Sequence, residues 1–174
     1  MGGLVIVGAM RAWTAYLLVL ATLLPVGTVR AAPANETSFV TRVLDLTNAE
    51  RQKAGLAPLT LNPRLVDSAQ TYSQVLASGN CFAHTCGPVP DFSERDEQAG
   101  YDGWTSIGEN IAGGYTTPEA VVAGWMASPG HRANILSADY TEIGIGLSDG
   151  GQFGRCWAQE FGARDDASND LAGD

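Results

Sequence analysis

The sequence feature that most restricts the fold lies near the C-terminal end, where two segments alternate in side-chain size. Residues 143–147 read Ile-Gly-Ile-Gly-Leu, the pair Asp149-Gly150 is typical of a tight hairpin turn, and residues 153–161 alternate large and mostly small side chains. Because successive side chains of a strand point to opposite faces, large residues line one face of this hairpin and small ones the other. Glycine within a strand indicates close approach of another backbone. We therefore predict an antiparallel sheet with helices on both faces, one set very close.

Three helices are predicted upstream of this hairpin. Apolar residues recur at helical spacing over residues 38–53, 62–79 and 117–127, and the second and third segments begin with a capping residue followed by proline. Residues 87–104 are predicted to be a loop with one short helical piece, and the glycine-framed residues 106–114 are predicted to be extended. These segments supply helices for both faces of the sheet.

Residues 1–34 are predicted to be a signal peptide rather than part of the fold. Arg11 precedes an apolar run, residues 16–26, that has the length of a signal-peptide core, and small residues follow it. The alternative is an uncleaved N-terminal anchor. Residues 13–29 are short for a bilayer span and include Pro25, so we favour cleavage.

Length and charge limit the classes of function. The chain has 174 residues, of which 45% are hydrophobic and 17% charged, and its net charge is -9. This composition is globular, and the acidic surface repels nucleic acid and anionic lipid headgroups. We predict one domain over residues 35–163 and an acidic flexible tail over residues 164–174. The mature protein is expected to be secreted and monomeric, without nucleic-acid binding and without a stable membrane span.

The cysteines are consistent with an exported protein. The chain has three, at positions 81, 86 and 156, so a monomer retains one unpaired thiol. Cys81 and Cys86 bracket His84 and are near enough in sequence to pair, so we favour this disulfide over a pairing through Cys156. A zinc site built on Cys81, His84 and Cys86 is an alternative, disfavoured by export and by the absence of a second cysteine pair.

His131 is a candidate for chemistry because of its rarity and its position. It is one of two histidines, and it follows Ser128-Pro129-Gly130, which is predicted to break the preceding helix sharply. A titratable ring on a rigid turn suits a functional site. The alternative is that His131 is a structural hydrogen-bonding residue that holds the turn.

Six groups of short motifs, taken together and in order, are more informative about the family than any single residue. They are Asn48-Ala-Glu-Arg; Leu61-Asn-Pro-Arg-Leu; Cys81-Phe-Ala-His; Gly108-Glu-Asn-Ile; Trp125 with Ser128-Pro-Gly-His-Arg-Ala-Asn-Ile-Leu; and Ile143-Gly-Ile-Gly with Trp157-Ala-Gln-Glu-Phe-Gly. In these motifs and their order, residues 38–163 resemble the CAP superfamily of cysteine-rich secretory, antigen 5 and pathogenesis-related 1 proteins, and more narrowly its bacterial exported SCP-like branch. The resemblance implies an α+β fold, a three-layer α-β-α sandwich around a small antiparallel sheet.

The resemblance also implies a central cleft that gathers two histidines and two glutamates. By motif, His84 and His131 match the histidines and Glu109 the first glutamate, whereas Ser128 occupies the position of the second. The remaining three side chains would form a His₂Glu set for Zn²⁺ or another divalent cation, with an open coordination position. Alternatively, they form a hydrogen-bonded cluster that joins three loops. Three polar residues are candidates to orient the rings: Asn110, Ser106 and Gln159.

The resemblance favours a binding or interaction module over an enzyme. Its ligand would be a component of the cell envelope, a lipid or a protein, held in the cleft. Four apolar loop residues could line a groove for an apolar ligand: Tyr101, Trp104, Ile111 and Tyr115. They could equally belong to ordinary core beneath the loop, which we favour.

An extracellular hydrolase, directed at peptide bonds or a cell-wall polymer, is the alternative function. In this interpretation His131 is the base, Glu109 orients it and Ser128 is the nucleophile. Ser128 and His131 would then have to lie within hydrogen-bonding distance. The sequence contains no GxSxG motif that would aim a serine in the usual way, so we favour the binding module.

Overall fold

The computed structural model describes residues 34–79 and 81–165. The elements follow in the order α1 (Ala34–Lys53), β1 (Thr60–Leu61), α2 (Pro63–Ala77), α3 (Phe92–Gln98), β2 (Trp104–Gly113), α4 (Pro118–Ala127), α5 (Pro129–Ile135), β3 (Glu142–Gly150) and β4 (Gly154–Arg164). The predicted signal peptide lies almost wholly outside these ranges, and so does most of the predicted tail. None of the helices within the ranges has the length and hydrophobicity needed to cross a bilayer.

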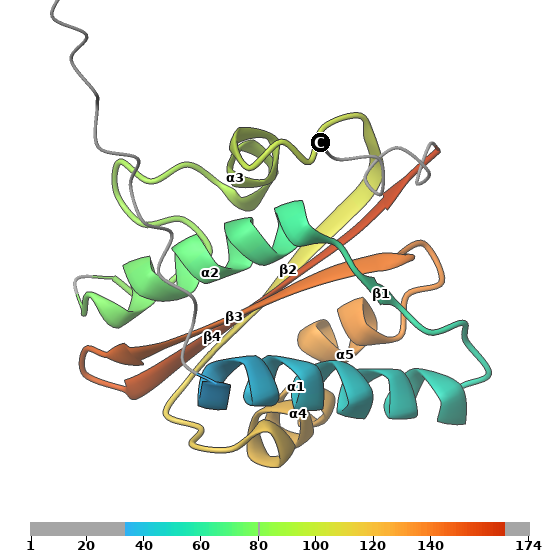
Figure 1. The fold of residues 1–174 in the computed structure, drawn as a ribbon, viewed down its shortest axis with the longest axis horizontal. Helices are drawn as coiled ribbons and strands as arrows, with labels where there is room; N and C mark the ends of the chain where they lie inside the picture. Colours follow the sequence, from blue (N-terminus) through green and yellow to red (C-terminus); the bar gives the residue numbers. More distant parts are fainter. Residues whose placement is uncertain (1–33, 80, 166–174) are drawn as a thin grey trace, which may run out of the picture. The chain divides into compact units, whose positions relative to one another are not determined.

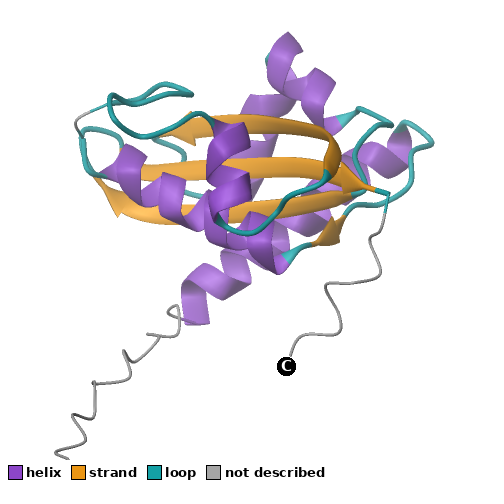
Figure 2. Cartoon of the chain, turned by 90° about the horizontal axis from the view of Figure 1, so that it is seen from above, coloured by secondary structure: helices purple, strands orange, loops and turns teal. Residues whose placement is uncertain are grey.

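A four-stranded sheet in the order β1-β3-β4-β2 forms the middle layer. β3 and β4 form the predicted antiparallel hairpin, and β2 extends it antiparallel to β4. The two-residue β1, which the sequence pattern does not identify as a strand, pairs in parallel with β3 and makes the sheet mixed. Helices α2 and α3 lie on one side of the sheet, and α1, α4 and α5 on the other (Figures 1 and 2). The predicted α+β class with three layers is confirmed.

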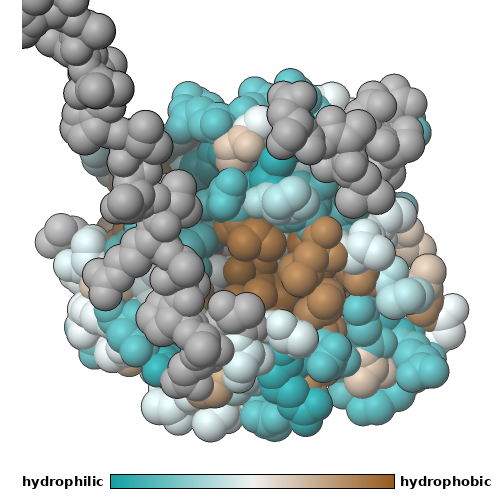
Figure 3. All heavy atoms as spheres, viewed as in Figure 1, coloured by the Kyte–Doolittle hydropathy of each residue, from teal (hydrophilic) through white to brown (hydrophobic). Residues whose placement is uncertain are grey.

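The α1 side of the sheet carries the large side chains. Trp125 of α4 packs with Trp157 and Phe161 of β4 in the larger of two apolar clusters, together with Val43 of α1. The buried rings are also anchored by polar bonds, since Trp125 Nε1 donates to the carbonyl of Ile111 at 3.2 Å. In the view of Figure 1, apolar side chains gather at the centre, between α1 and α2, and hydrophilic ones surround them (Figure 3).

The α2 side carries the small residues and brings two backbones together. A Cβ atom added to Gly144 would lie 2.0 Å from the carbonyl carbon of Leu65, and one added to Gly146 would lie 2.1 Å from the carbonyl oxygen of Ala69. Backbone atoms cannot move aside as a flexible side chain can. The glycines of β3 are therefore the reason that α2 can lie so close to the sheet, as the alternation predicts.

The helix boundaries follow their capping residues, with one correction. Asn62 accepts from Arg64 N at 2.9 Å at the start of α2, and Thr117 accepts from Ala120 N at 3.2 Å at the start of α4. Ser128 has an extended backbone, with ψ of 122°, and separates α4 from α5. The predicted break is present, but the residues after it form a second short helix. His131 therefore lies in the first turn of α5 rather than on an irregular turn.

The close packing of β3 on α2 gives a stability prediction. Gly146→Ala places a methyl group against the α2 backbone and should lower the free energy of unfolding by about 3 kcal/mol, measured by urea denaturation. Gly130→Ala is the control, because a Cβ at that position meets no atom within 4 Å outside its own helix. Equal stability of the two variants would contradict the packing argument.

Candidate functional site

His84 is held at the molecular surface by a short, constrained loop. Cys81 and Cys86 form a disulfide, the pairing favoured from the sequence, with their Cα atoms 5.6 Å apart. Tyr72 of α2 donates from its hydroxyl to the carbonyl of Ala83 within the same loop. The His84 side chain remains 54% exposed, so its ring can reach both protein and solvent.

The ring of His84 contacts the carboxylate of Glu109 in β2. The Nδ1 atom of His84 lies 2.6 Å from Glu109 Oε1, and the Glu109 side chain is fully buried. The other oxygen, Oε2, accepts from the Nη2 atom of Arg95. Each oxygen of the Glu109 carboxylate is therefore hydrogen-bonded to another side chain of the protein.

Arg95 of α3 is the residue that completes this arrangement. Its side chain is only 5% exposed, and its Nη1 atom donates to the carbonyls of His84, at 3.1 Å, and Pro90, at 2.7 Å. The guanidinium carbon lies 3.4 Å from the centre of the Tyr72 ring, a cation-π contact. Arg95 thus fixes the His84 loop and neutralises Glu109. The sequence does not single it out, because residues 87–104 carry no motif or periodicity that marks one arginine.

Two further acidic residues lie beside Arg95 in the interior. Glu160 is opposite Glu109 in the β2–β4 ladder, and its Oε1 atom lies 3.5 Å from Arg95 Nη2. Burial and the neighbouring carboxylates of Glu109 and Asp96 raise the pKa of Glu160 well above its ordinary value. Burial likewise raises the pKa of Asp96 to about 7, an effect that Ser68 and Arg95 partly offset. A single guanidinium among three carboxyl groups favours protonation of at least one of them.

His131 reaches the same strand from the other face of the sheet. Asn110, which follows Glu109 in β2, donates to the His131 carbonyl at 3.1 Å, and Asn134 donates to the Asn110 side chain at 2.9 Å and to the Glu109 carbonyl at 3.0 Å. These bonds fasten α5 to β2. Burial, followed by repulsion from His84, lowers the pKa of His131.

The candidate orienting residues meet different partners. Asn110 also donates to Gln159 Oε1 at 3.2 Å, and Gln159 donates to Thr47 of α1 at 3.1 Å, so both belong to the polar network beneath α5. Ser106 instead donates to the Asp139 carbonyl at 2.7 Å. Asn110 and Gln159 therefore act on the backbone that carries His131, and within the described part of the chain their hydrogen-bond partners do not include an imidazole nitrogen.

These contacts can be compared with the two predicted sets of site residues, the metal ligands and the hydrolytic residues. Within residues 34–79 and 81–165, no group of three or more His, Cys, Asp or Glu side chains is placed to hold a metal ion. The hydrogen bonds of those residues include none between Ser128 and His131, and Glu109 contacts His84 rather than His131. The three-ligand metal set of His84, Glu109 and His131 stays a prediction, and so does the hydrolytic set.

The apolar residues considered as a groove do not gather at one place. Tyr101 is fully buried and donates to Glu142 Oε2 at 2.7 Å, and Ile111 is 7% exposed in the smaller apolar cluster. Trp104 begins β2, whereas Tyr115 lies just beyond its other end and is 37% exposed. Core packing accounts for Tyr101 and Ile111, as we favoured from the sequence.

Comparisons with known proteins identify similar chains. A model of the cysteine-rich secretory protein family matches residues 44–161. The uncharacterized protein YkwD of Bacillus subtilis is 40% identical over 134 residues, which are 77% of this chain and 51% of that relative. The chain therefore spans about half the length of this relative.

Solved structures show the same fold. An extracellular protein from Bacillus anthracis that contains an SCP domain is 28% identical, with a TM-score of 0.69 over 74% of this chain and 41% of that one. An outer surface protein from Borrelia burgdorferi has a TM-score of 0.66 at 22% identity, over 73% of this chain and 93% of that one.

The role of Arg95 can be tested by its removal. Arg95→Met leaves Glu109 buried without its cation and should lower the free energy of unfolding by about 3 kcal/mol or more. Arg42→Met is the control, because Arg42 pairs with Glu119 at an exposed position, and it should leave stability nearly unchanged. Equal chemical-denaturation midpoints for the two variants would show that Arg95 does not support the fold.

The buried carboxyl of Asp96 should make stability depend on pH. Its pKa is higher in the folded protein than in the unfolded chain, so its contribution is greatest below about pH 4 and is lost as the pH rises to about 7. The stability of the wild type relative to Asp96→Asn should therefore fall across this range. Urea unfolding of both proteins at several pH values measures the difference, and a wild type that gains stability relative to Asp96→Asn as the pH rises would contradict the assignment.

Proposed function

Because the chain belongs to the cysteine-rich secretory protein family, as a member of the bacterial kind, we propose that it is an exported binding domain whose ligand contacts His84 and His131. The two residues reach the edge strand β2 from opposite faces of the sheet. The commitment of both Glu109 oxygens to Arg95 and His84 is the observation that carries the proposal.

Glu109 fixes which nitrogen of His84 is available. With Nδ1 bonded to Glu109, Nε2 is the nitrogen left for a ligand, and the ring is half exposed. A carboxylate that orients a histidine in this way is a common outer partner of metal-binding imidazoles. The lowered pKa of His131 keeps its ring neutral near neutral pH, and neutral imidazole is the form that binds metal ions.

We therefore propose a divalent cation, with Zn²⁺ as the probe, as one ligand of the cleft. His84 and His131 would be its protein ligands, and Glu109 would orient His84 rather than bind the ion. A bound cation would supply a positive centre that attracts an anionic or electron-rich group of a partner. Because two protein ligands leave several coordination positions open, we expect modest affinity.

Hydrolysis is less well supported by the same contacts. A serine hydrolase needs its nucleophile and base within hydrogen-bonding distance, and a third group to orient the base. Among the described side chains, Glu109 bonds to His84, and Ser128 makes no hydrogen bond to His131. We therefore propose binding rather than turnover as the activity of the cleft.

Export is proposed on two grounds. The relative from Bacillus anthracis is described as an extracellular protein, and it is 28% identical to this chain. The sequence of residues 1–34 also has the features of a signal peptide. Binding would then take place at the cell envelope or outside the cell.

Calorimetric titration of the EDTA-treated protein with Zn²⁺ tests the proposal. The wild type should bind one ion, and the double variant His84→Ala, His131→Ala should bind none. Glu109→Gln distinguishes a carboxylate that orients His84 from one that binds the ion directly. Loss of an orienting partner should weaken metal binding by about 10- to 100-fold, and loss of a direct ligand should abolish it. Zinc binding that survives in the double variant would refute the site.

A further inference from the structure

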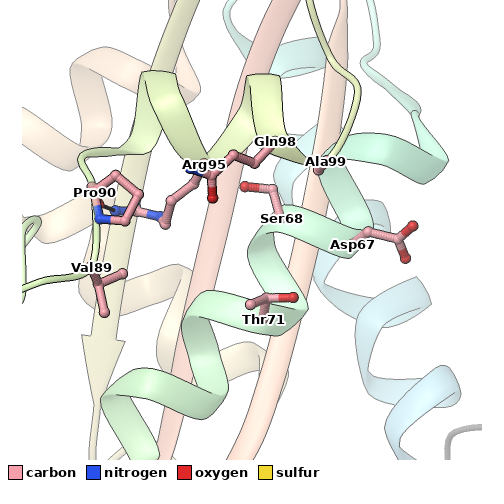
Figure 4. Close-up of a pocket in the computed structure, with 8 residues that line it drawn as sticks. All are labelled: Asp67, Ser68, Thr71, Val89, Pro90, Arg95, Gln98 and Ala99. Atoms are coloured by element: carbon pink, nitrogen blue, oxygen red, sulfur yellow. Dashed lines mark hydrogen bonds between the residues drawn. The ribbon is translucent and has the colours of Figure 1, made fainter.

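Glu160 of β4 is a fully buried acidic residue that lies directly beside the proposed cleft. The preceding residue, Gln159, bonds to Thr47 of α1, so Glu160 points to the other side of the sheet, which α2 and α3 cover. Arg95 lies on that side and extends from α3 toward Pro90 (Figure 4). Neither carboxyl oxygen of Glu160 accepts a hydrogen bond from an N–H or O–H donor among residues 34–79 and 81–165. An ionised carboxylate in this position would therefore lack the donors that burial requires.

The surroundings of Glu160 offer it another carboxyl group as a hydrogen-bond partner. Opposite it in β3 is Gly144, which has no side chain, and the backbone of α2 fills the space beside that glycine. Opposite it in β2 is Glu109, whose side chain is within hydrogen-bonding reach. Tyr72 of α2 is close as well, but its hydroxyl already donates to the carbonyl of Ala83. A hydrogen bond between two carboxyl groups requires a proton on one of them.

Glu109 is the better placed of the two to remain ionised. It accepts bonds from Arg95 and His84, which stabilise its carboxylate, whereas Arg95 Nη2 is 3.5 Å from Glu160 Oε1. Burial and the charges of Glu109 and Asp96 raise the pKa of Glu160 well above its ordinary value. We propose that Glu160 carries the proton, that its hydroxyl donates to the Glu109 carboxylate, and that Glu160 is thereby a positioning residue for His84.

The proton on Glu160 has two effects on the site. It leaves the buried guanidinium of Arg95 facing one carboxylate, that of Glu109, rather than two. It also gives that carboxylate a third donor, which restrains the group that holds His84 Nδ1 and so sets the direction of Nε2. The role in ligand binding rests on the proposed function, whereas the proton itself is present in the metal-free protein.

Infrared spectroscopy of the metal-free protein in D₂O tests for the proton. At about pH 8, above the pKa of about 7 that burial gives Asp96, the wild type should still show the C=O band of a protonated carboxyl group, and Glu160→Gln should lose it. Glu142→Gln is the matched control. Glu142 is also buried on the sheet, but it accepts bonds from Asn62 at 2.9 Å and Tyr101 at 2.7 Å, so its replacement should leave the band in place. A wild type without the band, or a band that persists in Glu160→Gln, would overturn the proposal.

Glu109→Gln identifies the acceptor in the same spectrum. The Glu160 band should change frequency or disappear, because an amide replaces the carboxylate to which the hydroxyl donates. A band that stays at the wild-type frequency would show that Glu160 donates to some other group, and the assignment would fail.

The ring ¹⁵N chemical shifts of His84, which depend on which nitrogen carries a proton, test the positioning role. Glu160→Gln should keep the wild-type shifts, because its amide N–H replaces the hydroxyl as a donor to Glu109, and Glu142→Gln should keep them too. Glu160→Leu removes the donor and should change them. Unchanged shifts in a folded Glu160→Leu variant would overturn the positioning role.

Two further outcomes keep the test decisive. If Glu160→Leu does not fold, Glu160→Gln and the infrared band decide, and altered His84 shifts in Glu160→Gln would overturn the proposal. All of these measurements use metal-free protein. Failure of the wild type to bind Zn²⁺ would therefore refute the proposed metal site without altering what these spectra say about Glu160.

Discussion

The ion pair between Arg95 and Glu109 is the interaction on which the arrangement of the site depends. A buried carboxylate needs a cation or several hydrogen-bond donors, and Glu109 obtains both from Arg95 and His84. The same guanidinium donates to the carbonyls of His84 and Pro90, so one side chain joins α3, the disulfide loop and the edge strand. One side chain therefore neutralises Glu109 and also holds the loop that carries the exposed His84 ring.

A second buried arginine joins separate segments by hydrogen bonds on the other face of the sheet. Arg51 of α1 is 1% exposed and donates to backbone carbonyls, those of Ala57, Ile135, Ser137 and Tyr140. Three of these carbonyls lie at the C-terminal end of α5 or just after it, where the backbone has no helical partners of its own. Asn110 of β2 donates to the carbonyl of His131 in α5 and accepts from Asn134 of the same helix. The two histidines are therefore carried by segments that buried polar side chains fasten to the sheet.

The sequence predicts the framework better than the site. Alternation over residues 143–161 predicts the hairpin, its two faces and the close approach of a helix, because these follow from local periodicity and from the absence of a side chain at glycine. Motifs place His84, Glu109 and His131 in one region. The partners of these residues could not be predicted, because Arg95 meets Glu109 through a tertiary contact between segments with no shared pattern. The strand β1 cannot be predicted in this way, because two residues are too few to show an alternating pattern of side chains.

Because Glu109 and Asn110 are neighbours in β2, the domain is sensitive to insertions and deletions in this strand. The Glu109 side chain bonds to His84 on one side of the sheet, and the Asn110 side chain bonds to α5 on the other, so the two contacts are one peptide unit apart. An insertion or deletion of one residue in β2 would exchange the two faces and break the contacts of Glu109 with His84 and of Asn110 with α5 at once. The length of the edge strand β2 therefore matters to both sides of the sheet at once.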